Sequence, residues 1–278
     1  MKNGERRPVT AEDYEEPACL LMTGKCSLPR VPTGRIVEKL DSLLDAEDYA
    51  GAERHLKYWL REAETVGDPL GESTVSSELA GLYRRSGRVG EAEEYAGLAL
   101  DAARRAGMEG TVFYATANLN AGTVFRAAGK YERSIEYFDA ALPVYASLPD
   151  SDSRKAGLFN NRALTLASLG RCAEAESSFR DALRCLESVP GSEGERAVTY
   201  LNLADLYEKL DGPEDASGRI AECLDLAEAE LAEGGAGTGG NAAFVLEKCA
   251  PVFAYYGRIA AERDCRKRAA EIRKKLKQ

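Results

Sequence analysis

Residues 129–142 read GKYERSIEYFDAAL, and the same order of small and large residues recurs on both sides of this stretch. In each copy a small residue is followed three positions later by a large apolar residue. A turn residue comes four positions after that, and a second small residue stands five positions beyond the turn. The clearest copies begin at Ser77, Asn118, Asn160 and Leu201, and their turn residues are Gly87, Gly129, Gly170 and Asp211. A recurrence about every 41 residues is typical of a repeat protein.

This pattern predicts pairs of antiparallel helices. Small residues let two helices approach closely, and large apolar residues at helical spacing fill the grooves beside them. A glycine after the first helix supplies the left-handed conformation that ends it. Because one hairpin cannot bury both of its faces, each hairpin must stack on the next. The sequence therefore predicts an all-α solenoid.

The small residue, the aromatic residue after it and the G-x-Y-x-x-A arrangement resemble the tetratricopeptide repeat, and residues 129–142 match it closely. The usual repeat is about 34 residues long. Repeats of about 41 residues are similar to the longer ones of kinesin light chains and related bacterial proteins. A looser copy begins at Leu40 and a degenerate one at Phe244. The resemblance implies a right-handed α-solenoid of about six hairpins.

The chain divides into an N-terminal arm and the repeat array. We expect the arm to span residues 1–33 and the solenoid to span residues 34–278. The expected repeats lie near residues 34–69, 70–109, 110–150, 151–192, 193–236 and 240–278. The arm contains four prolines and an apolar patch, Cys19 to Met22. Prolines resist regular structure whereas an apolar patch favours packing, so a disordered arm and a docked arm both stay open.

Charge and composition argue against several partners. The formal net charge is −9, although the residues from Arg258 onward include nine basic and three acidic side chains. An acidic body does not suit a polyphosphate backbone, and basic residues at the end of a last helix suit the helix dipole. The chain has no run of apolar residues long enough to span a membrane, and its start lacks an export signal. We therefore expect a cytoplasmic protein that binds neither nucleic acid nor membrane.

The sequence contains no convincing catalytic or metal-binding set. The single histidine, His55, lies in the second helix of the first copy and is expected to pack. Cys19 and Cys26 could hold zinc only with two further ligands, and no nucleotide-binding loop is present. Cys223 and Cys249 stand where the repeat requires small apolar residues, so we expect them to be buried. We predict a protein that is not an enzyme and that needs no cofactor and no metal.

The sharper signal is a row of asparagines. Asn120, Asn161 and Asn202 recur at one position of successive repeats. Asparagine is a poor residue inside a helix, because its amide competes for backbone hydrogen bonds. The resemblance places these side chains on a concave groove, where an amide can pair with the backbone of an extended peptide. The alternative is that they bond between neighbouring helices and hold the stack together.

Other side chains on the same helix faces complete the predicted groove. These candidates are Asn160, Arg84, Arg126, Thr123, Asp205 and Glu208. Arg84 and Arg126 could bind a carboxylate of a partner, and Asp205 and Glu208 could bind a basic residue of that partner. The leading functional hypothesis is a scaffold that takes a peptide or a partner helix in this groove. The alternatives are a peptide-sensing regulatory protein and a module that self-associates, as a homo-oligomer, through its terminal helices.

Overall fold

The computed structural model describes residues 30–232, 237 and 240–276. Within these ranges the chain forms twelve α-helices and no strand. The helices are α1 (Thr33–Asp45), α2 (Tyr49–Val66), α3 (Pro69–Arg85), α4 (Val89–Arg105), α5 (Val112–Ala127), α6 (Tyr131–Ala146), α7 (Asp152–Ser168), α8 (Cys172–Leu186), α9 (Glu193–Asp215), α10 (Ser217–Leu231), α11 (Gly240–Tyr255) and α12 (Ile259–Leu276). They fall into two compact units, residues 1–130 and residues 131–278. The predictions made on residues 1–29, including those on Cys19 and Cys26, lie outside the described residues.

The first unit contains α1 to α5, and three of these helices, α2, α3 and α5, begin at a polar cap. α3 packs against α4, α2 packs against α3, and α5 contacts both α3 and α4. The carboxylate of Asp68 accepts hydrogen bonds from the backbone N–H groups of Gly71 and Val31, each at 3.0 Å. A capping carboxylate satisfies amides that the first turn of a helix leaves unpaired. Asp68 therefore caps α3 and also holds the chain that leads into α1.

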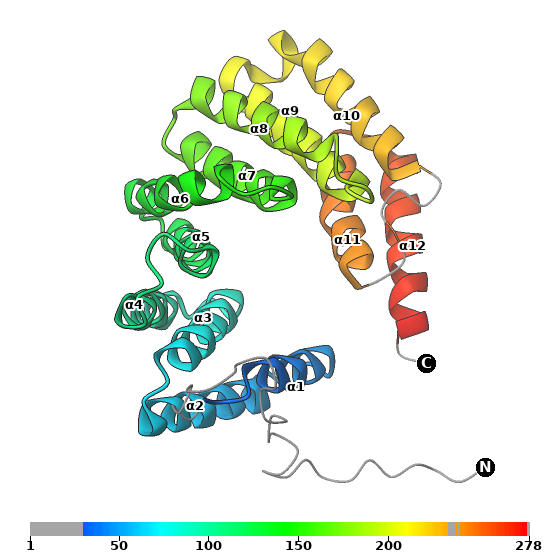
Figure 1. Cartoon of the computed structure of the whole chain (residues 1–278). Coiled ribbons are helices and arrows are strands. Elements are labelled where there is room, and N and C mark those ends of the chain that lie inside the picture. Colours follow the sequence, from blue (N-terminus) through cyan, green and yellow to red (C-terminus); the bar gives the residue numbers. More distant parts are fainter. Residues whose placement is uncertain (1–29, 233–236, 238–239, 277–278) are drawn as a thin grey trace, which may run out of the picture. The chain divides into compact units, whose positions relative to one another are not determined.

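The second unit contains three further helix pairs, α7–α8, α9–α10 and α11–α12, after α6 (Figure 1). Each pair is antiparallel, and α9 contacts α7, α8 and α11. The small residues of the repeat lie at the closest approaches: Ala163 and Ala204 are both 0% exposed. The large residues that follow them, Leu166 and Tyr207, are buried as well. The all-α repeat architecture that the sequence predicts is confirmed.

The turns between paired helices follow the predicted glycines, with one correction. Gly87, Gly129 and Gly170 have φ of +74°, +72° and +75°. In the fourth copy the residue with positive φ is Gly212, with φ +82° and ψ +165°, so the prediction of Asp211 was wrong by one position. This region of backbone space is open almost only to glycine. One additional residue therefore precedes this turn, and Pro213 follows it.

The cysteines of the repeat are part of the core. Cys223 is 6% exposed and Cys249 is 0% exposed, which confirms their predicted burial. Burial raises the pKa of the Cys223 thiol to about 11 and that of Cys249 to about 12. Both thiols are therefore protonated at neutral pH and behave as small apolar groups.

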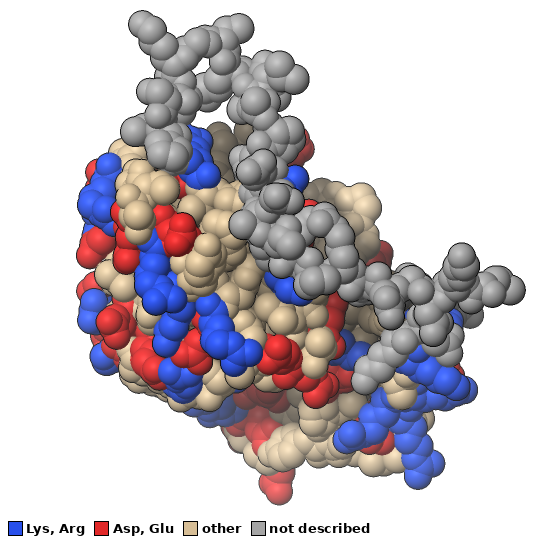
Figure 2. Space-filling model, turned by 90° about the horizontal axis from the view of Figure 1, so that it is seen from below, with Lys and Arg blue, Asp and Glu red and all other residues tan. Residues whose placement is uncertain are grey.

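Charged side chains cover the outside of the helices. Figure 2 shows acidic and basic side chains interspersed over the face that it draws, with basic ones gathered toward its lower right. Many of them pair within a helix, such as Arg184 with Asp181 and Arg180 with Glu176. The last turn of α12 carries Arg273, Lys274 and Lys275, as the helix dipole favours. None of the described helices has the length and apolar content that a membrane span requires.

Candidate functional site

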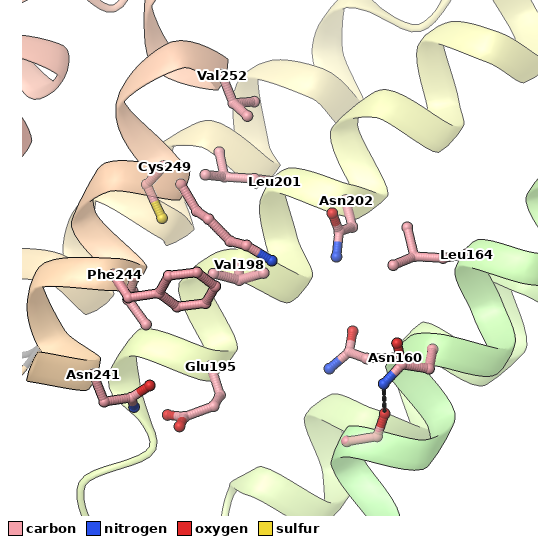
Figure 3. A pocket seen from close by; sticks show the side chains of 14 residues that line it. Asn160, Leu164, Glu195, Val198, Leu201, Asn202, Asn241, Phe244, Cys249 and Val252 are labelled. Atoms are coloured by element: carbon pink, nitrogen blue, oxygen red, sulfur yellow. Dashed lines mark hydrogen bonds between the residues drawn. The ribbon is translucent and has the colours of Figure 1, made fainter. Parts of the chain in front are cut away.

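The second unit has a hollow of about 350 Å³ between three first helices of successive hairpins, α7, α9 and α11 (Figure 3). These helices lie side by side because small residues stand where they approach. A methyl group at Gly194 of α9 would lie 3.2 Å from Cγ1 of Val245 on α11, which is tighter than ordinary packing. Glycine at this position therefore lets α11 pack closely on α9 beside the hollow.

Three of the predicted asparagines line the hollow, and each is used differently. Asn160 donates from Nδ2 to Oγ1 of Thr199 at 2.9 Å, which links α7 to α9. Asn161 donates to the carbonyl of Gly157 within its own helix at 2.8 Å. Neither the Asn202 amide nor the buried Oδ1 of Asn160 has a hydrogen-bond partner among residues 30–232, 237 and 240–276. The stack-holding hypothesis was made for Asn120, Asn161 and Asn202, whereas the bond between α7 and α9 is made by their neighbour Asn160. Asn202 and Asn160 Oδ1 retain hydrogen-bonding capacity for a ligand.

The remaining wall of the hollow is largely apolar. Leu164 of α7, Val198 of α9 and Val252 of α11 are half-buried and face it (Figure 3). Phe244 of α11 also faces it and is 49% exposed, which is high for a phenylalanine. The ammonium group of Lys248 lies 4.8 Å from the centroid of the Phe244 ring. An apolar surface with a few convergent polar groups is typical of a ligand-binding cleft.

Asp205 and Glu208 do not line the hollow, and their carboxylates already have partners. Tyr256 donates to Oδ1 of Asp205 at 3.0 Å and to Oε2 of Glu208 at 2.7 Å. Tyr255 donates to Oε1 of Glu208 at 2.7 Å. The hydrogen bonds from Tyr255 and then Tyr256 lower the pKa of Glu208, whereas burial raises the pKa of Asp205. Both carboxylates therefore tie α9 to the end of α11.

The other predicted residues belong to the first unit. Arg84 on α3 and Arg126 on α5 are half-buried, and the pKa of Arg84 is lowered by burial and by the like charges of Arg85 and Arg126. Asn120 is exposed, and its backbone carbonyl accepts a hydrogen bond from the hydroxyl of Thr123 at 2.7 Å. The Arg84 and Arg126 side chains are thus close enough to repel each other, and an anion placed between them would relieve that repulsion.

The sequence analysis did not single out the α11 side chains of the hollow. Asn241, Phe244, Lys248 and Val252 recur at intervals of three or four residues, which is the spacing of one helix face. That spacing was available in the sequence as a signal. It was obscured because the copy that contains these residues is degenerate and follows a glycine-rich link.

The residues that the sequence analysis considered for chemistry have packing roles where they are described. His55 donates from Nε2 to the carbonyl of Ile36 at 3.0 Å, and burial lowers the pKa of its imidazole. No group of three or more His, Cys, Asp and Glu side chains that could hold a metal ion occurs in the described part of the chain.

Antiparallel helix pairs that stack in sequence, with a hollow between the first helices α7, α9 and α11, are the architecture of a helical repeat scaffold. A tetratricopeptide repeat model matches residues 71–147 and 154–229, more than half of the chain, so the chain belongs to the tetratricopeptide repeat family. No curated protein matches it in sequence.

Solved structures with the same fold include BtubC (BKLC) from P. vanneervenii, with a TM-score of 0.62 at 24% identity, over 72% of this chain and 83% of that one. The apo form of RapI has a TM-score of 0.57 at 16% identity, over 88% of this chain and 84% of that one. A Rap protein complexed with Competence and Sporulation Factor has a TM-score of 0.53 at 17% identity, over 88% and 75%. At these identities the likeness concerns the fold alone.

Proposed function

We propose that this protein is an interaction scaffold that holds an extended peptide segment of its partner in the hollow between α7, α9 and α11. The observation that supports this most is the Asn202 amide, which faces the hollow and has no partner among the described residues (Figure 3). A peptide backbone offers both the donor and the acceptor that such an amide requires. The fold also agrees, since a similarly folded Rap protein is known as a complex with Competence and Sporulation Factor.

The size of the hollow favours a peptide over a partner helix. An α-helix with its side chains is about 10–12 Å across, so a single turn occupies more than the hollow provides. A hollow of about 350 Å³ matches the lower range of small-molecule and short-peptide sites. Two or three residues of an extended chain would fill it, with the backbone against the asparagines.

The proposal is tested by substituting the unused amide. Peptides are selected from a random library on the full chain, and their affinities are measured for the wild type and for Asn202→Ala. Losing one hydrogen bond should weaken binding by about threefold to tenfold. Asn202→Ala should not lower the melting temperature, because Asn202 bonds to no described residue and alanine is the better helix former. Glu222→Ala, an exposed site on α10, is the control and should leave binding intact.

The proposal is wrong if every selected peptide binds Asn202→Ala as tightly as it binds the wild type. Asn160→Ala provides an internal comparison, because this change also removes the hydrogen bond to Thr199. It should therefore lower both stability and affinity, whereas Asn202→Ala lowers affinity alone.

A further inference from the structure

Two charged side chains line the hollow without an ionic partner. Glu195 of α9 and Lys248 of α11 both face it, and no described group of opposite charge lies within 4.0 Å of either. Most other basic side chains of this unit are paired, for example Arg196 with Glu230 at 2.7 Å and Arg162 with Asp139 at 2.8 Å. The hollow is therefore a place where charges of both signs are left available.

The position of the Lys248 charge is restricted by its surroundings. Lys248 is held over the ring of Phe244, with Nζ 4.8 Å from the centroid, where a cation is attracted by the face of the ring. Gly194 lies level with Val245, and Lys248 is three residues further along α11, a rise of about 4.5 Å. Glu195 follows Gly194 directly. α9 and α11 run parallel, since Asp205 of α9 contacts Tyr256 at the same sequence offset. Lys248 therefore lies two residues, about 3 Å, further along the hollow than Glu195.

The wall of the hollow beside the two charges is apolar and partly exposed. Phe244 is 49% exposed, and Val198 and Val252 are half-buried. Covering such a surface is favourable because it removes apolar area from water. An apolar side chain of a ligand that lay against Phe244 would be close to the Lys248 ammonium group at that ring and would share the hollow with Glu195 (Figure 3).

We propose, building on the peptide-binding function above, that the hollow selects a dipolar motif: an acidic and a basic residue two positions apart in an extended chain, with an aromatic or aliphatic residue at the next position on the same face. The acidic residue pairs with Lys248 and the basic one with Glu195. In an extended chain, residues two positions apart point to the same face and are about 6.6–7 Å apart. Their side chains can therefore reach both Glu195 and Lys248, which lie on two helices whose axes pack about 8–10 Å apart. A polyphosphate is disfavoured, because Glu195 and the net charge of −9 both repel it.

The test exchanges the two charges. Random 12-residue peptides are displayed and selected on the full chain, and enriched peptides should carry the dipolar motif in one preferred order. The affinity of such a peptide should fall by about tenfold or more on Lys248→Glu and on Glu195→Lys. The double variant Glu195→Lys/Lys248→Glu should bind the peptide in which the acidic and basic residues have changed places.

The control exchanges charges elsewhere in the same unit. Glu222 on α10 and Lys267 on α12 are exposed and form no ion pair with a described residue, so Glu222→Lys/Lys267→Glu preserves the same charge balance. This control should bind the original peptide with unchanged affinity. Phe244→Ala, at another exposed position, should weaken binding by about tenfold or more without a change in helix content.

The outcomes separate the two proposals. If selected peptides depend on Asn202 but show no charge motif, or bind the exchanged variant equally well in either order, the dipolar motif is refuted and the peptide-binding function stands. If the library yields no peptide that binds better than unselected ones, both proposals fail.

Discussion

Glu53→Gln should destabilise the first unit, because one carboxylate joins three of its helices. Glu53 lies on α2 and accepts from Tyr83 of α3 at 2.9 Å. It also accepts from Arg88, at the start of α4, at 2.6 Å and from Lys57 of its own helix at 2.7 Å. The hydrogen bond from Arg88, followed by that from Lys57, lowers the pKa of Glu53 to about 2. A neutral amide would lose the charge that makes these bonds strong.

The size of the effect follows from the pKa and from the exposure of the partners. A decrease from 4.5 to about 2 sets an upper limit of roughly 3 kcal/mol, at 1.36 kcal/mol for each pH unit. The side chains of Arg88 and Lys57 are 39% and 44% exposed, so water screens the interaction. We therefore expect a loss of about 1–2 kcal/mol at pH 7. Because the folded-state pKa is lowered, this contribution is present above pH 4.5 and is lost as the pH falls toward 2.

The assay is urea unfolding of the wild type, Glu53→Gln and a control at pH 7 and at pH values approaching 3. Glu64→Gln is the control, since Glu64 lies on the same helix, is exposed and has no ion pair with a described residue. The free energy of unfolding should differ between wild type and Glu53→Gln at pH 7, and the difference should shrink with acid. Equal values at pH 7, or an equal loss in Glu64→Gln, would refute the assigned role of this carboxylate.

Two further predictions concern a titrating group and a turn. Burial lowers the pKa of His55 below 6.5, so acid protonates the unfolded chain first, and stability should decrease below about pH 6.5 by at most about 1.4 kcal/mol for each pH unit. In His55→Gln the urea midpoint should change less between pH 7.5 and pH 5.5 than it does in the wild type. An equal change in both proteins would contradict this prediction. Gly212→Ala should cost about 1–3 kcal/mol, because φ is +82° and ψ is +165° there. Gly218→Ala, with nothing within 4 Å of the added methyl group, should cost nothing, and equal melting temperatures for the two variants would contradict the strain.

The sequence was sufficient for the fold because the repeat specifies packing locally. Ala80 and Ala204, at the small position of two copies, are 1% and 0% exposed, and Gly87 has the left-handed conformation expected of a turn. Each of these residues is constrained by neighbours a few positions away in its own hairpin. The shift from Asp211 to Gly212 occurred where one additional residue broke the alignment of the copies.

The polar partners were harder to predict, because they depend on contacts between hairpins. Tyr83 and Tyr207 were recognised as large core residues, but the repeat pattern does not show that their hydroxyls donate to Glu53 and Glu176 of the preceding hairpin. Glu208 was predicted as a groove residue, and its bonds to two tyrosines of the following hairpin became apparent only when the helices were placed. A carboxylate on a helix surface has many potential partners, and the sequence alone does not choose among them.

The wall that α11 contributes to the hollow makes recognition depend on local folding. α11 is held mainly by α9 and by its own partner α12, so fraying of this one pair would remove Phe244 and Lys248 together. The apparent dissociation constant then equals the intrinsic one divided by the fraction of molecules in which the pair is intact. Heat, or a substitution at the α9–α11 contact, would weaken ligand binding even though the substituted residue does not contact the ligand. A bound ligand would in turn slow the opening of the pair.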